Sequence, residues 1–271
     1  MTEENFKKAE KAAGERSPVN RNLSREAERM ENCHSLDKSR IGFIGISGGA
    51  GTTFLTVCLA RFLANTRKLD PAVVELGKGS IYDSIGMDKH FAGRDFFGFF
   101  KALEEGKSIR GRKNMDEGIN WIIRSPEELP LFLSYEQKLR LINSVAGNVI
   151  LYDFSGCDKD YQSFLELMDQ IIVIIDPLPS KMLEGYQTLC RLKAFEISGG
   201  EVIYTVNKHN KGINQREMYD FLKIRNPYII PMVSMENIYT AEYTCKIPYS
   251  LGEVKSILYE PIRKIAEQLE F

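Results

Sequence analysis

The sequence predicts an α/β protein, a doubly wound and mostly parallel sheet flanked by helices. Three observations predict this class. Apolar runs of strand length recur along the chain, helical stretches lie between several of them, and a glycine-rich turn follows the first run. Continuously apolar strands are typical of parallel sheets, because helices cover both faces of such sheets. Ligands of these folds bind beyond the carboxyl ends of the strands.

The apolar runs and the stretches between them predict the elements in order. The expected strands are residues 41–46, 71–76, 119–124, 148–154, 170–176, 201–207 and 227–232. The expected helices are residues 53–65, 161–168, 180–196 and 215–223, with a further amphipathic stretch at 253–271. Strands alternating with helices indicate right-handed crossovers between parallel neighbours.

The composition indicates one large domain after a polar arm. The chain has 271 residues, of which 43% are hydrophobic and 27% charged, enough for one substantial core. Residues 1–40 are dominated by polar side chains and predict a flexible N-terminal arm, and residues 41–271 form the predicted domain. A pair such as Cys33 and His34 in the arm is too small a ligand set for a metal site.

Charge and cysteine content limit the compartment and the partners. The net charge of −1 gives no strong signal for nucleic acid or an anionic membrane surface. Five cysteines without metal-ligand spacing indicate a reducing compartment. No apolar run reaches membrane-spanning length, and the N-terminus lacks the apolar stretch of a signal peptide. We expect a cytoplasmic protein without a transmembrane segment.

The glycine-rich turn lies where a phosphate-binding loop would lie. Gly48, Gly49 and Gly51 allow a close approach of the backbone to an anion, and the hydroxyl of Thr53 can hold a metal. Thr52 occupies the position at which such loops carry a lysine that reaches the outer phosphates. The alternative is an ordinary glycine-rich turn from a strand into a helix.

A single aspartate ends the fourth expected strand. Asp153 is followed by Phe154, Ser155 and Gly156. An aspartate at a strand end beside a phosphate loop can hold the shell of a magnesium ion, and a nearby glycine N–H can contact a terminal phosphate. We therefore assign Thr53 and Asp153 to a metal site and Gly156 to the phosphates. The alternative is a strand-end aspartate that caps the following helix.

Ser47 to Thr53, S-G-G-A-G-T-T, resembles the deviant phosphate loop K-G-G-x-G-K-[ST] of the ParA/MinD superfamily. Among its branches, the loop is similar to G-G-x-G-[AS]-T-T in the CpaE/TadZ proteins of tight-adherence (Flp) pilus assembly, which lack the same lysine. Ser47 replaces the superfamily's signature lysine. The resemblance implies binding of ATP or ADP with Mg²⁺, through the cofactor-binding residues Gly48, Gly49, Ala50, Gly51, Thr52 and Thr53.

The resemblance extends to the later strand ends. Asn207, in YTVNKHN, matches a strand-end asparagine that recognises adenine in the superfamily, and Pro231 matches a segment whose backbone lines the base pocket. Asn207 as a turn residue in a left-handed conformation is an equally physical explanation. Asp153 to Gly156 matches D-x-P-x-G only in part, because Ser155 replaces the proline.

The resemblance also implies a lost water-positioning group. In the superfamily, the strand that corresponds to residues 71–76 ends in D-x-D. In this chain Glu75 stands at the position of the first aspartate and Gly77 at the position of the second. Asp83 could substitute if its loop folded back, and Lys78 could supply the missing cation. We make no assignment of a catalytic residue.

Two other segments carry open alternatives. Phe96, Phe97, Phe99 and Phe100 precede Arg110, Arg112 and Lys113, a pattern that suits single-stranded nucleic acid but more often marks core and solvated loop. The C-terminal stretch from Glu253 is either a membrane-surface helix or a helix packed on the sheet. Its mixed charges favour packing.

The two lysines missing from the loop predict slow hydrolysis of ATP. One well-placed electrostatic group is worth ~10² to 10³ in rate, so loss of two leaves hydrolysis slow or absent. We expect a pseudo-ATPase that acts as a homodimeric scaffold or localisation factor in Flp pilus assembly, with pilus or secretion-machine proteins as partners. Those partners would also bring it to the inner face of the cell membrane. The alternatives are an active ATPase that partitions DNA or positions a surface machine, and a nucleotide-free interaction module.

Overall fold

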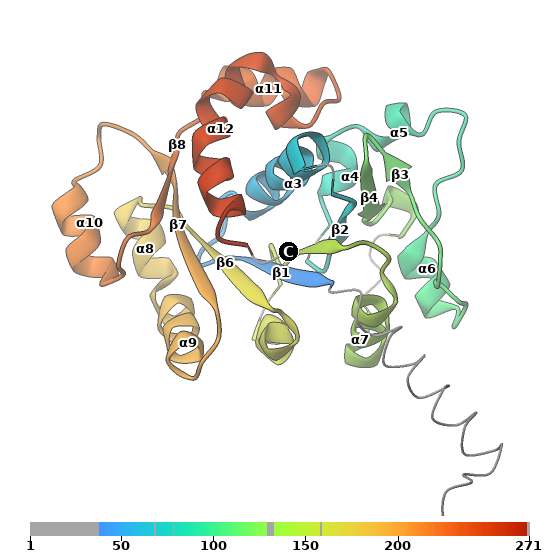
Figure 1. Ribbon diagram of the computed structural model, residues 1–271, viewed down its shortest axis with the longest axis horizontal. Helices are drawn as coiled ribbons and strands as arrows, with labels where there is room; N and C mark the ends of the chain where they lie inside the picture. The colour runs from blue at the N-terminus through green and yellow to red at the C-terminus, as the bar shows by residue number, and fades with distance from the viewer. Residues whose placement is uncertain (1–37, 68, 78, 129–132, 158, 270–271) are drawn as a thin grey trace, which may run out of the picture. The chain divides into compact units, whose positions relative to one another are not determined.

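An eight-stranded sheet has the strand order β3-β4-β2-β5-β1-β6-β7-β8 (Figure 1). The strands are β1 Ser39–Gly45, β2 Pro71–Glu75, β3 Met115–Asp116, β4 Ile119–Ile122, β5 Val149–Asp153, β6 Gln170–Ile175, β7 Val202–His209 and β8 Tyr228–Pro231. All seven predicted strands are confirmed, and the structure adds the short β3. β3 and β4 pair antiparallel, and the other neighbours pair parallel.

The computed structural model describes residues 38–67, 69–77, 79–128, 133–157 and 159–269. Most of the arm predicted over residues 1–40, including Cys33 and His34, lies outside these described residues. Lys78, the candidate replacement cation, also lies outside them. β1 begins at Ser39, slightly before its predicted start, and the described residues from Ser39 onward form one compact unit.

The strand β1 lies where the strand order reverses. It pairs on one side with β5, which leads to β2 and β4, and on the other with β6, which leads to β7 and β8. In open parallel sheets, the crevice beyond the strand ends at such a reversal is the usual ligand site. The loop after β1 also lies beside the end of β5, because Phe43 is in register with Asp153.

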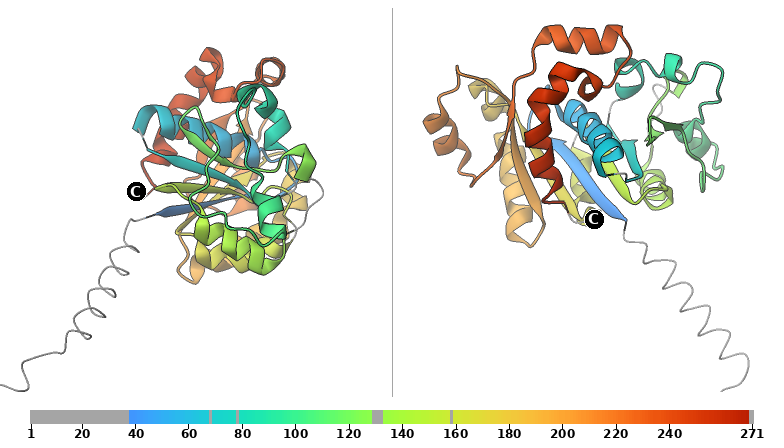
Figure 2. Two further views of the ribbon diagram at one scale, coloured as in Figure 1. Left: turned by 90° about the vertical axis from the view of Figure 1, so that its right-hand side faces the viewer. Right: turned by 45° about the horizontal axis from the view of Figure 1, so that its top comes forward.

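Helices cover both faces of the sheet (Figure 1). One face carries α3 (Thr52–Phe62), α11 (Met235–Tyr243) and α12 (Gly252–Ala266), and the other carries α7 (Tyr135–Ser144) and α9 (Tyr186–Ile197). Figure 2 shows α3 and α12 side by side. The other helical elements are η1 (Leu63–Arg67), α4 (Ile81–Ser84), α5 (Met87–His90), α6 (Phe99–Glu104), η2 (Pro126–Glu128), η3 (Lys159–Leu167), α8 (Pro179–Glu184), α10 (Gln215–Leu222) and η4 (Pro248–Ser250).

The predicted helices are present, with corrections. The helix expected over residues 53–65 is α3 followed by the π-helical η1, and the one expected over 161–168 is the 3₁₀ helix η3. The single helix expected over 180–196 is two helices, α8 and α9, that meet at Gly185. A Cβ at Gly185 would stand 2.7 Å from the carbonyl oxygen of Ile46, so the helix junction packs directly against the end of β1.

Two buried clusters fill the space between the sheet and its helices. The cluster under α3 and α12 contains Phe62, Trp121 and Leu258, and the cluster on the opposite face contains Tyr152 and Phe164. The apolar side of α12 is buried in the first cluster, which confirms that the C-terminal helix packs on the sheet.

The aromatic segment before the basic loop belongs to the core. Phe99 and Phe100 are 2% and 0% exposed and line α6. Arg112 is exposed, and its guanidinium carbon lies 5.2 Å from the centre of the Phe97 ring. The favoured interpretation of this segment, core phenylalanines followed by a solvated loop, is confirmed.

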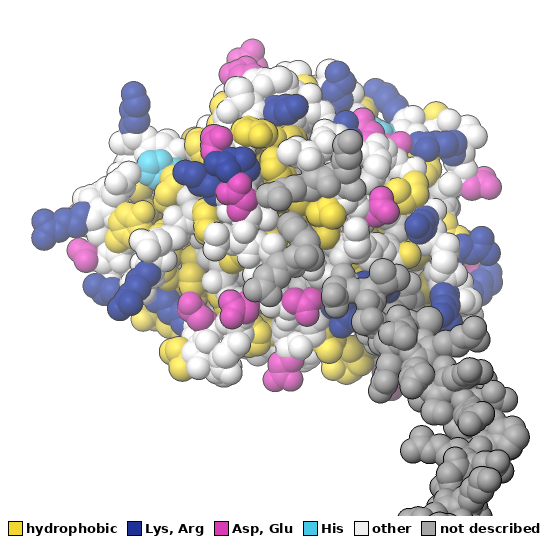
Figure 3. Space-filling view, viewed as in Figure 1, with side chains coloured by type: hydrophobic (Ala, Val, Ile, Leu, Met, Phe, Trp, Pro, Cys, Tyr) yellow, Lys and Arg dark blue, Asp and Glu magenta, His cyan; other side chains and the backbone are white. Residues whose placement is uncertain are grey.

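The face shown in Figure 3 carries basic and acidic side chains interspersed among apolar ones. This distribution agrees with the near-zero net charge of the chain. Within the described ranges, no helix is both long and apolar enough to cross a membrane.

Candidate functional site

The backbone between β1 and α3 curves around the start of the helix. Gly49 and Gly51 have φ angles of 76° and 91°, which residues with a side chain rarely adopt. Gly51 precedes α3 and provides no side-chain cap. The first N–H groups of α3 thus lack a side-chain acceptor in the described structure, and the positive end of the helix dipole lies beside them. This arrangement suits an anion.

The position of the usual loop lysine holds a small, buried side chain. Thr52 is 5% exposed, and its hydroxyl oxygen would lie 2.4 Å from a Cβ placed on Gly45. The Thr52 side chain therefore lies against the end of β1, and the loop itself carries no cation. Ser47, which the sequence resemblance pairs with the signature lysine, has a buried hydroxyl without a hydrogen-bond partner in the described structure.

Two polar side chains from the end of β7 hold the loop. Asn207 is 4% exposed and donates from Nδ2 to the carbonyl oxygen of Ala50 at 2.8 Å. Lys208 donates from Nζ to the carbonyl oxygen of Gly49 at 2.5 Å and forms an ion pair with Asp176 at 2.7 Å. Lys208, with φ of 55°, and not Asn207, is in the left-handed conformation. The turn-residue explanation of Asn207 is therefore wrong, and its role in base recognition stays a prediction.

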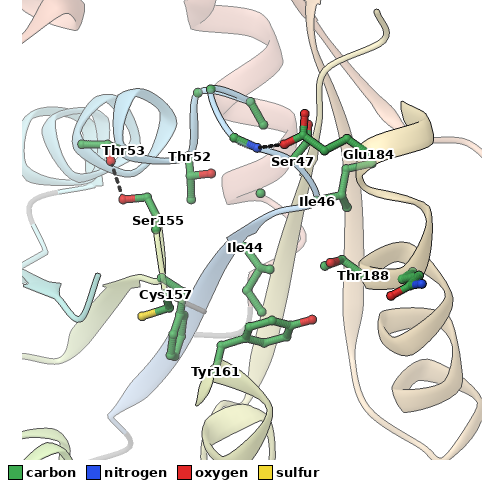
Figure 4. Close-up of a pocket in the computed structure, with 18 of the residues that line it drawn as sticks. Ile44, Ile46, Ser47, Thr52, Thr53, Ser155, Cys157, Tyr161, Glu184 and Thr188 are labelled. Carbon is green, nitrogen blue, oxygen red and sulfur yellow. Dashed lines mark hydrogen bonds between the residues drawn. The ribbon is translucent and has the colours of Figure 1, made fainter. Parts of the chain in front are cut away.

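A carboxylate contacts the first glycine of the loop from the other side. The N–H of Gly48 donates to Oε1 of Glu184 at 3.1 Å, the contact drawn in Figure 4. Lys181, one turn earlier on α8, forms an ion pair with Oε2 of Glu184 at 2.7 Å. This hydrogen bond of Lys181 lowers the pKa of Glu184 from its ordinary value, and the Gly48 N–H adds to the effect.

Oxygen ligands gather where the start of α3 meets the end of β5. The Thr53 hydroxyl donates to Oδ2 of Asp153 at 2.7 Å and lies 2.8 Å from the Ser155 hydroxyl. Ser155 also bonds Asp153, through its hydroxyl at 3.0 Å and its backbone N–H at 2.8 Å. The structure therefore brings together the two predicted metal ligands. Hard oxygen donors of this kind fit Mg²⁺, which keeps several waters and phosphate oxygens besides one or two protein ligands.

Burial shifts the pKa of the Asp153 carboxyl. The residue is 0% exposed, and desolvation raises its pKa from 3.8 to about 6, against the lowering effect of the hydrogen bonds from Thr53 and Ser155. The carboxylate is thus costly to charge without a cation beside it. Within the described ranges, no group of three or more His, Cys, Asp and Glu residues forms a metal cluster.

The loop after β2 leaves no room for a side chain at position 77. Glu75 is 1% exposed, and its carboxylate accepts from the backbone N–H groups of Ser80 and Ile81 at 2.7 and 3.0 Å, so it caps α4. A Cβ at Gly77 would stand 1.6 Å from the carbonyl oxygen of Ser155. Any side chain at position 77 requires the backbone to move.

A cavity of about 980 Å³ opens beside these groups. It is lined by the glycine loop, by Phe154 to Cys157 after β5, by Tyr161, and by Glu184, Thr188 and Arg191 from α8 and α9 (Figure 4). Gly156, with φ of 67°, lines it, and its contact with a terminal phosphate stays a prediction. Tyr161 is 6% exposed and its hydroxyl has no hydrogen-bond partner in the described structure.

A second cavity, of about 700 Å³, lies beyond the ends of β6, β7 and β8. Its wall includes Asp176, Lys208, Asn210 and Met232. Pro231 does not line it. Pro231 is half-buried at the end of β8, in register with His209 of β7, so its place near a base stays a prediction.

Sequence reasoning missed four residues of this site: Lys208, Ser155, Tyr161 and Glu184. Lys208 follows the predicted Asn207 directly, and Ser155 follows Asp153 within the same motif, so both could have been found from strand-end position. Glu184 and Tyr161 carry no local signal, because their helices reach the loop only through the tertiary fold.

Solved structures share this fold. A ParA family ATPase from Chlorobium tepidum TLS matches with a TM-score of 0.69 and 17% identity, over 85% of this chain and 100% of the other. A plasmid partition protein of Borrelia burgdorferi B31 bound to AMPPNP has a TM-score of 0.65 and 16% identity, over 85% and 99%. The cell division ATPase MinD of Pyrococcus furiosus has a TM-score of 0.62 and 14% identity, over 84% and 98%.

No family model and no curated protein sequence matches the chain. At these identities the structural likeness establishes the fold alone. The chain has the fold of the ParA/MinD group of P-loop NTPases, with a mostly parallel sheet between two helical layers and a glycine loop leading into α3.

Proposed function

We propose that this chain is a ParA/MinD-like protein that binds ATP or ADP with Mg²⁺ and hydrolyses ATP slowly or not at all. The observation that carries the proposal is the oxygen cluster of Thr53, Asp153 and Ser155 directly below a glycine loop that lacks a lysine. The loop amides and the α3 dipole supply attraction for phosphates. Thr53 and Asp153 would hold the metal, which neutralises phosphate charge when bound.

Two features argue against fast hydrolysis. The loop offers no cation to stabilise charge on a transferred phosphoryl group. Ser47 replaces the signature lysine, and Thr52 replaces the usual loop lysine. The sequence resemblance pairs position 77 with the superfamily's water-positioning acid, and the close contact between Gly77 and Ser155 leaves no room for a side chain there. Each lost electrostatic group costs ~10² to 10³ in rate, so turnover should fall well below that of an active ATPase.

The proposed cellular role is that of a homodimeric scaffold or localisation factor in Flp pilus assembly. Support comes from the loop sequence S-G-G-A-G-T-T, which shares with CpaE/TadZ proteins both the glycine pattern and the missing lysine. Pilus or secretion-machine proteins would be the partners, and the protein would reach the inner face of the membrane through them from the cytoplasm.

A second candidate function is that of a partner-binding module that does not bind nucleotides. The contacts of Glu184 with the Gly48 amide and of Lys208 with the Gly49 carbonyl favour it, because the chain itself then supplies polar partners to the loop. Binding data separate the two functions, since this module would bind neither ADP nor ATP.

Calorimetry of the purified full chain with MgADP and MgATP tests the proposal, together with phosphate release and a mass measurement with and without nucleotide. We expect saturable binding, little phosphate release, and weaker binding for Thr53→Ala and Asp153→Ala. Fast magnesium-dependent turnover, lost in those two variants, would instead establish an active ATPase. Absence of binding at millimolar nucleotide would favour the second candidate function, the partner-binding module.

A further inference from the structure

The carboxylate of Glu184 occupies the N–H donor at the first glycine of the loop. Its Oε1 accepts from the Gly48 N–H at 3.1 Å, while Lys181 holds Oε2 at 2.7 Å. Gly48 and Gly49 are exposed to the cavity, and Glu184 lines the same cavity. A side-chain anion thus sits on a backbone donor of the kind that a phosphate oxygen would use.

The position of Glu184 is set by packing close to the loop. Gly185, the next residue, abuts Ile46 so tightly that a Cβ there would stand 2.7 Å from the Ile46 carbonyl oxygen. The end of α8 therefore packs against the end of β1, and the Glu184 carboxylate beside it lies at the cavity. A glutamate is ionised at neutral pH, and the hydrogen bonds from Lys181 and the Gly48 N–H lower the pKa of Glu184 further.

The effect of the Glu184 carboxylate on a bound polyphosphate would depend on the number of phosphates. The amides at the start of α3 and the oxygen cluster around Thr53 can hold the inner phosphates without Gly48. A longer chain needs more of the loop and reaches the amide that Glu184 already fills. It also carries one more negative charge, which the negative charge of the Glu184 carboxylate would repel.

We propose that Glu184 makes the loop select nucleoside diphosphates over triphosphates, by holding a carboxylate on the Gly48 amide where the outermost phosphate would bind. This proposal rests on the proposed nucleotide-binding function and names the ligand that its site prefers. Glu184 acts as a specificity-determining residue. In an active ATPase with this loop, a carboxylate at that place would oppose binding of the substrate.

Calorimetric dissociation constants for MgADP and MgATP with the full-length wild type and Glu184→Gln test the selectivity. Glutamine keeps the size and the acceptor oxygen but removes the charge, and Glu184→Ala removes both. We expect the wild type to favour ADP, and Glu184→Gln to tighten ATP binding about tenfold with a smaller effect on ADP. The matched control is Glu201→Gln, which removes an exposed carboxylate near the opposite end of β7.

The outcomes separate this proposal from the proposed function. Binding of ADP and ATP with an unchanged ratio in Glu184→Gln would overturn the selectivity and leave the nucleotide site intact. Binding of ATP by Glu184→Gln but not by the wild type would support both. If neither the wild type nor the variants bind any nucleotide at millimolar concentration, both proposals fail.

Discussion

Gly77 and Ser155 approach so closely that a Cβ on Gly77 would stand 1.6 Å from the Ser155 carbonyl oxygen. The contact joins the loop after β2 to the segment after β5, where Ser155 lines the cavity. The fold therefore leaves no room for a side chain at position 77 unless the backbone moves.

The first prediction concerns this contact. Gly77→Ala should destabilise the protein by about 3 kcal/mol, because overpacking forces backbone shifts in a well-packed region. Chemical denaturation followed by circular dichroism measures the change. Gly252→Ala is the matched control, since a Cβ there meets no atom within 4 Å and alanine favours the first turn of α12. Equal stability of the two variants would contradict the close approach.

The second prediction is a pH dependence. The pKa of Asp153 is about 6 in the folded protein and 3.8 ordinarily, so the native state binds the proton more tightly than the unfolded state. Stability from this group is therefore fully present below pH 4 and is lost as the pH rises toward 6. Without metal, Asp153→Asn should be more stable than wild type at pH 7, by up to about 3 kcal/mol.

Denaturation at pH 4 and pH 7 in metal-free buffer checks this dependence. The advantage of Asp153→Asn should shrink as the pH falls. Asp95→Asn, which removes a carboxylate from an exposed position, is the control and should change little. A difference between Asp153→Asn and wild type that does not vary with pH would contradict the raised pKa.

The third prediction restores the missing charge. Thr52→Lys should tighten binding of MgADP about tenfold, because charge-assisted hydrogen bonds to phosphate are worth more than neutral ones. Thr52→Met, of similar length but uncharged, separates the charge from the loss of the buried threonine. Calorimetry measures both variants. Equal affinities for the lysine and methionine variants would show that position 52 does not face the phosphates.

The fourth prediction concerns the buried hydroxyl of Tyr161. Because this hydroxyl has no partner in the described structure, Tyr161→Phe should leave stability unchanged or raise it by about 1 kcal/mol. Tyr204→Phe is the control, since the Tyr204 hydroxyl donates to Glu196 at 2.7 Å and its removal should cost about 1 kcal/mol. Urea titrations measure both. A clear loss of stability in Tyr161→Phe would reveal a partner for its hydroxyl.

Much of the fold could be predicted because its signals are local. The buried strands are apolar runs, and the glycine turn, Thr53 and Asp153 follow strand ends that must meet at one edge of a parallel sheet. The helices α7 and α11 were missed although both begin at a serine cap. Ser134 accepts from the Gln137 N–H and Ser234 from the Asn237 N–H, a pattern that marks a helix start.

The unpredicted parts of the site depend on contacts between distant segments. Gly48 and Glu184 are 136 residues apart, and no periodicity or spacing relates them. The same holds for Gly77 and Ser155, whose approach depends on the packing of two loops. Asn207 was found from its place at a strand end, but its orientation toward Ala50 follows from the path of the loop backbone.

The central claim is that the loop amides bind a polyphosphate without a lysine. Amide NMR resonances of ¹⁵N-glycine-labelled protein, titrated with MgADP, test it most directly. Saturable shifts of Gly49 and Gly51, with Gly252 unmoved, are the result we expect. Unchanged resonances of these two loop glycines at millimolar MgADP would contradict the claim.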